Sequence, residues 1–253
     1  MIDLQGKPIA ITGASSGIGL ATALACAKAG MPVALAARRL DRLEAAAERI
    51  RSGGGRAIAV ECDVNSKEDC KRLIEKTSEA IGPIYSVFAN AGYGVESPVE
   101  TMYTIWPAAE QMRRHGRGHI LICSSCASKI AVPNFAAYSA TKAAQDHIGR
   151  AMRLEMRKTG IRVSTVHPIG TDTEFSEQVE QRSQRPRGAT RTPLMFRQSA
   201  ETVANAVVKC LRRPRGEVWT SLPMRTLLAT GTLFPGFADV MMARLMKDPK
   251  PGE

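Results

Sequence analysis

The sequence has few aromatic residues, few cysteines and no long apolar run. Aromatic side chains make up 5% of the 253 residues, too few for a row of rings on which single-stranded nucleic acid stacks. Six scattered cysteines do not suit a disulfide-dense secreted domain, so we expect reduced thiols. Cys123 and Cys126 have no second pair or histidine at metal-binding spacing, and we predict no metal site. Without a signal peptide or an apolar run of about eighteen residues, we expect a cytoplasmic protein.

The charge is strongly positive, with 35 Lys and Arg against 24 Asp and Glu, a formal net charge of +11. Such a chain can attract nucleic acid, anionic lipid or phosphorylated ligands. The basic residues are scattered rather than clustered, so we predict no nucleic-acid binding. The hydrophobic share of 44% and the charged share of 23% are typical of a folded globular domain.

Short apolar runs alternate with helical stretches from residue 8 onward, a pattern that indicates βαβ units around a parallel sheet. We predict one α/β domain over residues 1–253: a Rossmann-like, doubly wound parallel sheet with helices on both faces. The predicted strands are 8–11, 33–37, 57–61, 84–89, 119–123, 162–166 and 217–220. The predicted helices are 18–29, 39–51, 67–80, 107–114, 136–158 and 200–213.

Two segments depart from this alternation. Residues 184–197 are rich in Arg and Pro with little periodicity, and we expect a mobile loop beside the substrate. Residues 222–253 form a C-terminal extension whose first part, 222–246, is apolar and rich in Met. This part is expected to pack against the core or a partner subunit, with peripheral membrane contact as the weaker alternative.

A glycine-rich segment follows the first predicted strand and opens a helix. Gly13 suits a tight turn, Gly17 lets the backbone approach a pyrophosphate, and Gly19 allows close packing of the helix. The backbone N–H groups at the start of a helix bind phosphate oxygens. We therefore predict a dinucleotide site, with a glycine-rich turn that binds nothing as the alternative. The cofactor-binding residues expected here are Gly13, Ser15, Ser16, Gly17, Ile18 and Gly19.

Two arginines follow the second predicted strand. An NAD site usually has Asp or Glu there, about 20 residues after the glycines, to bond the ribose 2′-hydroxyl. This sequence has Arg38 and Arg39 instead, and no neighbouring carboxylate to repel a phosphate. Because a guanidinium holds a phosphate through paired charged hydrogen bonds, we predict NADP(H) as the cofactor. The alternative is that both arginines lie on a solvated helix start.

Ser125, Tyr138 and Lys142 form a set that suits proton transfer to a reduced carbonyl. The spacing of four residues places Tyr138 and Lys142 on one face of a predicted helix. A phenol is a weak acid unless a nearby cation stabilises its phenolate, and Lys142 supplies such a cation. We predict that Tyr138 is the acid/base and that Ser125 bonds the carbonyl oxygen.

Polar or small residues also follow two further predicted strands, at the edge where ligands of open parallel sheets bind. They are Asp63, Val64, Asn90, Ala91 and Gly92. Together with the glycine-rich segment, Ser125 and the segment from Tyr138 to Lys142, they make the chain resemble the short-chain dehydrogenase/reductase family over nearly its whole length.

The resemblance implies further roles in cofactor binding. Asp63 and Val64 would contact the adenine, and Asn90 would support the strand beside the cofactor. Lys142 would also bond the nicotinamide ribose. Pro168 and Thr173 would belong to the loop beside the nicotinamide, although Ile169 stands where the family usually has glycine, which restricts that loop.

A second departure from the family lies between Asn90 and Ser125, which are 35 positions apart. By resemblance this interval is short by roughly 15 to 20 residues, about the length of a long helix. The shortening falls near Glu100 and Thr101 and removes the portion that carries a catalytic Asn in the family. Either the chain lacks this segment, or the sequence as given omits it. A Cα step well beyond 3.8 Å at this point would indicate the omission.

We therefore expect an NADP(H)-dependent oxidoreductase that interconverts a carbonyl and a secondary alcohol. The alternative is a catalytically impaired relative that binds the cofactor and acts in sensing or as a scaffold. A lipophilic small-molecule substrate is expected, because apolar side chains would line its pocket: Val95, Ile130, Val132, Phe135, Leu194, Met195 and Phe196. By analogy with the family, a homodimer or homotetramer is expected, and the predicted helix 136–158 offers these residues for packing: Ala143, Ala144, Ile148, Ala151 and Met152.

Overall fold

The computed structural model describes residues 1–92, 98–133, 135–171, 173–174 and 197–245. Its strands are β1 (Ile9–Thr12), β2 (Val33–Ala37), β3 (Ala57–Glu61), β4 (Ser86–Ala89), β5 (Gly118–Cys123), β6 (Ile161–His167), β7 (Gly170–Thr171), β8 (Arg197–Gln198) and β9 (Glu217–Trp219). Its helices are α1 (Gly17–Lys28), α2 (Leu40–Ser52), α3 (Lys67–Ile81), α4 (Pro98–Arg114), η1 (Cys126–Lys129), α5 (Ala136–Glu155), α7 (Ala200–Arg212), α8 (Leu222–Leu233) and α9 (Pro235–Leu245).

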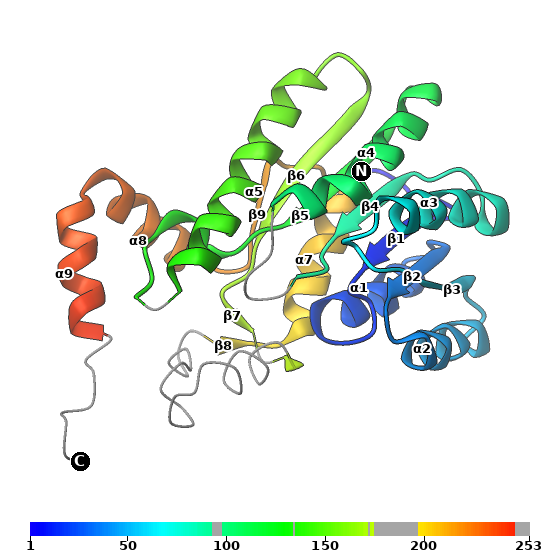
Figure 1. Ribbon diagram of the computed structural model, residues 1–253, viewed down its shortest axis with the longest axis horizontal. Helices are drawn as coiled ribbons and strands as arrows, with labels where there is room; N and C mark the ends of the chain where they lie inside the picture. The colour runs from blue at the N-terminus through cyan, green and yellow to red at the C-terminus, as the bar shows by residue number, and fades with distance from the viewer. Residues whose placement is uncertain (93–97, 134, 172, 175–196, 246–253) are drawn as a thin grey trace.

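Seven strands form one parallel sheet in the order β3-β2-β1-β4-β5-β6-β9. Helices α1, α2 and α7 pack on one face, and α3, α4 and α5 pack on the other (Figure 1). Every residue of β1, β4 and β5 is buried, as expected for parallel strands covered on both sides. The strand order reverses between β1 and β4, so a ligand is expected at the carboxyl ends of these two strands.

The doubly wound parallel fold predicted from the sequence is confirmed. Each of the seven predicted strands forms, with ends that differ by no more than two residues. The short strands β7 and β8 were not predicted, because two residues each are too few for a periodic pattern. They pair with one another through Gly170 and Arg197, so Arg197 lies in a strand and not in the predicted loop 184–197. Residues 184–196 of that loop lie outside the described residues.

Helix α4 is longer than predicted. Pro107 suggested a helix start, because proline suits the first turn, but it lies inside α4, which begins at Pro98. Proline there removes one backbone hydrogen bond, and the burial of Ile105, Ala108 and Met112 against the sheet offsets this loss. Helix α4 includes residues 100 and 101, where the sequence indicated a shortened interval. Helix α5 is shorter than predicted, because it ends at Glu155 and not at residue 158.

The C-terminal extension forms the two helices α8 and α9, at one side of the molecule (Figure 1). Leu228 and Ala238 are buried, and α8 packs against η1, as expected for packing on the core. The large apolar side chains that remain exposed here are Leu222, Leu233, Phe234, Phe237 and Val240. Among the described helices, none combines the length and apolar character needed to span a membrane. Contact of this surface with a partner or a membrane stays a prediction.

The homodimer or homotetramer also stays a prediction, but Met152 is not available for packing between subunits. Met152 of α5 is 7% exposed and packs into the core of its own chain, so it is not available to a partner. Ala151 is exposed, and Ala143, Ala144 and Ile148 are partly so. The six cysteines are free thiols, five of them buried, as expected.

Candidate active site

The loop between β1 and α1 packs tightly because its glycines have no side chains. Gly13 has a φ of +67°, and a Cβ there would lie 2.9 Å from the Cα of Ala91. A Cβ at Gly19 would collide with the carbonyl oxygen of Gly13. Ile18 is partly buried against the core beneath the loop. The result is a tight turn that ends at the start of α1, where backbone N–H groups can bind a pyrophosphate.

Asn90 ties the carboxyl ends of β1 and β4 together. Its backbone N–H and that of Ala91 both donate to Thr12 Oγ1 at 3.1 Å, and Asn90 Nδ2 donates to the Thr12 carbonyl at 3.0 Å. Gly92 follows and is exposed. The segment from Asn90 to Gly92 therefore lies beside the glycine loop, at the edge where the sequence predicted it.

Asp63 and Val64 lie at the same edge, after β3. The Asp63 carboxylate accepts from the Asn65 backbone N–H at 3.1 Å and from Asn65 Nδ2 at 2.9 Å. Val64 is partly buried against the core. In the described structure this carboxylate holds the turn before α3, and the predicted adenine contact stays a prediction.

Arg39 contacts the glycine loop. The Arg39 guanidinium donates to Ser15 Oγ at 3.0 Å and to Ser16 Oγ at 3.1 Å. Arg38 is exposed to solvent. Arg42, which the sequence reasoning missed, lies one turn into α2 beside Arg39, and its position three residues later was the available signal.

A carboxylate occupies this basic cluster, contrary to the expectation of none. Glu174 accepts from Arg39 at 3.0 Å and from Arg42 at 2.5 Å. The hydrogen bond from Arg42 lowers the pKa of Glu174, burial opposes this shift, and the hydrogen bond from Arg39 adds to it. Glu174 lies 135 positions from Arg39, so no local pattern could reveal the pair. The two arginines thus already bind an oxyanion, which is the chemistry that a ribose 2′-phosphate requires, and the two serine hydroxyls accept hydrogen bonds from Arg39.

Tyr138 and Lys142 lie on one face of α5, as predicted. The Lys142 ammonium lies 5.7 Å from the centre of the Tyr138 ring. Lys142 is 7% exposed, and its Nζ donates to the Cys123 carbonyl at 3.0 Å and to Gln145 Oε1 at 2.9 Å. The ring of Tyr138 is partly buried and meets Phe135 edge to face. The structure therefore brings a phenol and a buried cation together.

Ser125 is positioned by the short helix that follows β5. Its Oγ accepts from the Ala127 N–H at 3.1 Å, which leaves the hydroxyl proton to donate elsewhere. The preceding Ser124 donates from its Oγ to the Lys142 carbonyl at 2.8 Å. This hydrogen bond connects the end of β5 to α5. Ser125 therefore lies at the end of the strand whose Cys123 carbonyl also accepts a hydrogen bond from Lys142.

A buried ionic cluster lies behind Ser125, and the sequence reasoning missed it. His167 Nδ1 is 3.2 Å from the Ser125 carbonyl, and the imidazole stacks on Trp219 at 4.5 Å. On its other side, His167 Nε2 is 3.4 Å from the Asp146 carboxylate. Burial alone raises the pKa of Asp146, but hydrogen bonds from His167 and Lys129 hold it well below its ordinary value.

The same cluster has the residue types of a metal site but a different role. Asp146, His167 and Glu217 offer ligand atoms within 4.8 Å of one another. The ammonium of Lys129 lies 2.6 Å from Asp146 and 3.4 Å from Glu217, so a cation of the chain itself already balances both carboxylates. The cluster is an ion-pair network that supports the segment after Ser125.

The loop after β6 reaches both parts of the site. The Pro168 carbonyl accepts from the Cys126 N–H at 3.0 Å. Thr173, expected near the nicotinamide, lies against the glycine loop: a Cβ at Gly17 would be 3.0 Å from Thr173 Cγ2. Thr173 thus lies where α1 begins, and its contact with a nicotinamide stays a prediction.

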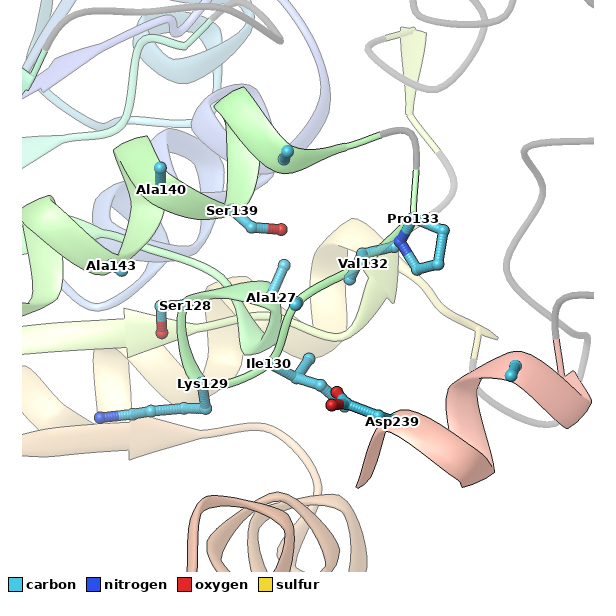
Figure 2. Close-up of a pocket in the computed structure, with 13 residues that line it drawn as sticks. Ala127, Ser128, Lys129, Ile130, Val132, Pro133, Ser139, Ala140, Ala143 and Asp239 are labelled. Carbon is cyan, nitrogen blue, oxygen red and sulfur yellow. The ribbon is translucent and has the colours of Figure 1, made fainter. Parts of the chain in front are cut away.

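A cavity of about 670 Å³ lies on the side of η1 and α5 that faces α9 (Figure 2). Its walls are mainly apolar, and Ile130 and Val132, predicted for a substrate pocket, are among them. Ser139 points toward it in Figure 2, and its buried Oγ has no hydrogen-bond partner among the described residues. Neither Ser125 nor Tyr138 lines the cavity, but Ala127 and Ser139, which lie close to them in the chain, do. Phe135 is not part of the lining, and Val95, Leu194, Met195 and Phe196 lie outside the described residues.

Known proteins match this chain in sequence. The family described as short chain dehydrogenase matches residues 7–104 and 95–184. An uncharacterized oxidoreductase of Listeria innocua is 32% identical over 230 residues, which cover 83% of this chain and 92% of the relative. The two family matches overlap at residues 95–104, where the sequence indicated a shortened interval, so the start of α4 is where this chain departs from the family.

Solved structures share the fold. A short chain dehydrogenase/reductase from Burkholderia phymatum, in complex with NAD, matches with a TM-score of 0.79 and 22% identity, over 98% of this chain and 99% of that one. A short-chain type dehydrogenase/reductase from Mycobacterium marinum matches with a TM-score of 0.74 and 29% identity, over 86% and 94%. The sheet described above is therefore shared over nearly its full extent.

Proposed function

The chain belongs to the short-chain dehydrogenase/reductase family, whose members are oxidoreductases that use nicotinamide cofactors, and we propose that it interconverts a carbonyl and a secondary alcohol with NADP(H). The observation that carries this proposal is the buried ammonium of Lys142, 5.7 Å from the ring of Tyr138. Both lie on α5 beside the carboxyl end of β5, at the sheet edge that also holds the glycine loop. A phenol beside a cation at this edge suits proton transfer to a bound substrate.

Each residue has one task in this reaction. Bound NADPH supplies the hydride that reduces the carbonyl carbon. Ser125 donates a hydrogen bond from its hydroxyl to the substrate oxygen and stabilises the charge that develops there. Tyr138 gives its proton to that oxygen, and Lys142 stabilises the resulting phenolate. In alcohol oxidation the same proton returns to Tyr138.

The choice of NADP(H) is supported by the cluster of Ser15, Ser16, Arg39 and Arg42. The two guanidiniums bind the carboxylate of Glu174, and the guanidinium of Arg39 also donates to the two serine hydroxyls. These ion-pair side chains are 37% to 46% exposed, so the carboxylate contributes only about 0–1 kcal/mol. A 2′-phosphate carries more charge and more acceptor oxygens than a carboxylate, and can displace it.

Arg39→Ala is expected to weaken NADPH binding about 30-fold and NADH binding less than threefold, because charged hydrogen bonds to the phosphate are worth about 2 kcal/mol. Fluorescence titration of each cofactor gives the two dissociation constants. Arg38→Ala should have the smaller effect on NADPH, and Arg49→Ala, on the exposed face of α2, controls for the loss of a positive charge. Equal losses for the two cofactors in Arg39→Ala would refute the 2′-phosphate role.

The cavity beside η1 supports a lipophilic substrate. Six of its thirteen lining residues are alanine, and Ile130 and Val132 add larger apolar side chains. The charged residues Lys129 and Asp239 also belong to the lining. We infer that the apolar part of the substrate extends into it from the reacting carbonyl. The buried hydroxyl of Ser139 has no hydrogen-bond partner among the described residues, which is costly. We infer that it forms a hydrogen bond with a polar substituent on the apolar part of the substrate.

Ala143→Phe is expected to raise KM about tenfold for bulky lipophilic ketones and to leave small ketones within twofold, since the added ring fills part of the cavity. Steady-state kinetics across aliphatic, steroidal and polar carbonyls measure this. Ala80→Phe, at an exposed position on α3, is the matched control. A uniform KM change across small and bulky ketones would place the substrate elsewhere.

A second candidate function is favoured by the absence of an Asn from α4, where the resemblance implies a catalytic one. In this alternative the chain binds NADP(H) without turnover and acts as a sensor or scaffold. NADPH binding by the intact 253-residue chain, together with no turnover of any carbonyl, distinguishes it from the oxidoreductase.

A further inference from the structure

Gln145 is a buried amide that bonds directly to the ammonium of Lys142. It lies one turn after Lys142 on α5 and is 2% exposed. Its Oε1 accepts from Lys142 Nζ at 2.9 Å, and its Nε2 donates to Thr101 Oγ1 at 2.8 Å. Because Thr101 belongs to α4, one side chain connects two helices at the position of the buried cation.

Only one orientation of this amide suits both partners. The ammonium of Lys142 has three donors and no acceptor, so the NH₂ group of Gln145 cannot face it favourably. The hydroxyl of Thr101 accepts a hydrogen bond as readily as it donates one. The amide oxygen therefore faces Lys142 and the amide nitrogen faces Thr101, and this orientation is held from both ends.

The two acceptors on Lys142 restrict a long, flexible side chain. One of its three N–H groups bonds to the Cys123 carbonyl and another to Gln145, and in this position Nζ lies 5.7 Å from the centre of the Tyr138 ring. A buried ammonium needs such partners, because a charge without hydrogen bonds is strongly disfavoured in the interior. Gln145 thus helps to keep the cation both charged and in place.

Other charged groups near this part of α5 are engaged with one another. Asp146 directs its carboxylate to Lys129 and His167, and Glu217 also pairs with Lys129. Among the described residues, no acidic side chain forms an ion pair with Lys142. The field of this ammonium is therefore balanced by neutral acceptors, and a charge placed on residue 145 would change it directly.

We propose that Gln145 is a positioning residue, which holds the ammonium of Lys142 beside Tyr138 through an amide anchored on Thr101. The inference rests on the proposed function, in which this ammonium stabilises the Tyr138 phenolate. Packing alone does not account for glutamine here. A leucine would fill a similar space between α4 and α5 without burying an amide, which costs free energy unless both its ends are bonded.

Two substitutions test this role through the phenol itself. Gln145→Glu keeps the shape of the side chain and places a negative charge beside Nζ of Lys142. This charge offsets the field of the ammonium, so the phenolate of Tyr138 loses stabilisation. Gln145→Leu removes both hydrogen bonds and adds no charge. The matched control is Gln111→Leu, which removes a partly buried amide that bonds Ser78 and the Ile84 N–H away from Lys142. Circular dichroism checks that each variant of the full chain folds.

The readout is the pH titration of phenolate absorbance, taken as the difference between each protein and the same protein carrying Tyr138→Phe. We expect Gln145→Glu to raise the midpoint by about one pH unit or more, and Gln111→Leu to leave it unchanged. If the protein turns over a carbonyl, Gln145→Leu should lower kcat about tenfold, the equivalent of its lost hydrogen bond to Lys142.

The outcomes separate this inference from the proposed function. A midpoint in Gln145→Glu equal to that of the wild type would overturn the positioning role, even in an active enzyme. A raised midpoint together with no turnover by the wild-type protein would uphold the role and count against the oxidoreductase. An equal shift in Gln111→Leu would reduce Gln145 to a packing residue and overturn the inference.

Discussion

Tyr138→Phe is expected to lower kcat/KM for carbonyl reduction about a thousandfold, with NADPH binding changed less than threefold. The substitution removes only the hydroxyl that donates the proton. The ring keeps its edge-to-face contact with Phe135 and its place beside the ammonium of Lys142. The binding site for the cofactor phosphates, built on the glycine loop, is not altered.

Steady-state reduction and fluorescence titration of NADPH together measure this separation of binding from chemistry. Tyr85→Phe is the control, because it removes the hydroxyl of a partly buried tyrosine at the amino end of β4, the opposite edge of the sheet. Retention of most of the activity in Tyr138→Phe on an identified substrate would show that another group supplies the proton.

Lys142→Met is expected to lower kcat/KM by two to three orders of magnitude and to move the pH dependence of alcohol oxidation upward by about one unit or more. Oxidation requires the phenolate, so its rate rises with pH as the phenol ionises. A cation 5.7 Å from the ring favours the ionised form, and methionine retains the length of the side chain without the charge. With the cation gone, a higher pH is needed to reach the same fraction of phenolate.

The pH profile of kcat/KM for oxidation measures this effect, with Arg150→Met as the control. That control removes a cation from the exposed side of the same helix and should leave the profile in place. An unchanged inflection in Lys142→Met, whatever the loss of rate, would show that the ammonium does not act on the phenol.

Features set by neighbouring residues could be predicted from the sequence. The apolar runs predicted the strands, because parallel strands covered on both faces must be apolar throughout. The glycine loop followed from the steric needs of the turn, with Gly13 at positive φ. The spacing of Tyr138 and Lys142 placed both on one helix face, since residues four apart lie one turn apart.

Features that depend on tertiary contacts could not be predicted in this way. Glu174 reaches Arg39 across 135 positions, and Gln145 acquires its role only because α4 brings Thr101 to it. The sequence could not say that Arg39 turns toward the glycine loop, because that depends on the chain direction where α2 begins. Pro107 was misleading because proline is also tolerated inside a helix whose apolar face is buried.

Transfer of deuterium is the most direct test of the central claim, that Tyr138 and Lys142 serve hydride transfer to a carbonyl. The full chain is incubated with NADPH deuterated at C4 of the nicotinamide and with a panel of lipophilic ketones, and the products are examined by mass spectrometry. We predict one deuterium on the carbinol carbon, and about a thousandfold slower formation of this product when the protein carries Tyr138→Phe. Tight binding of NADPH with no deuterium in any product would contradict the claim and favour a protein that binds the cofactor without using it.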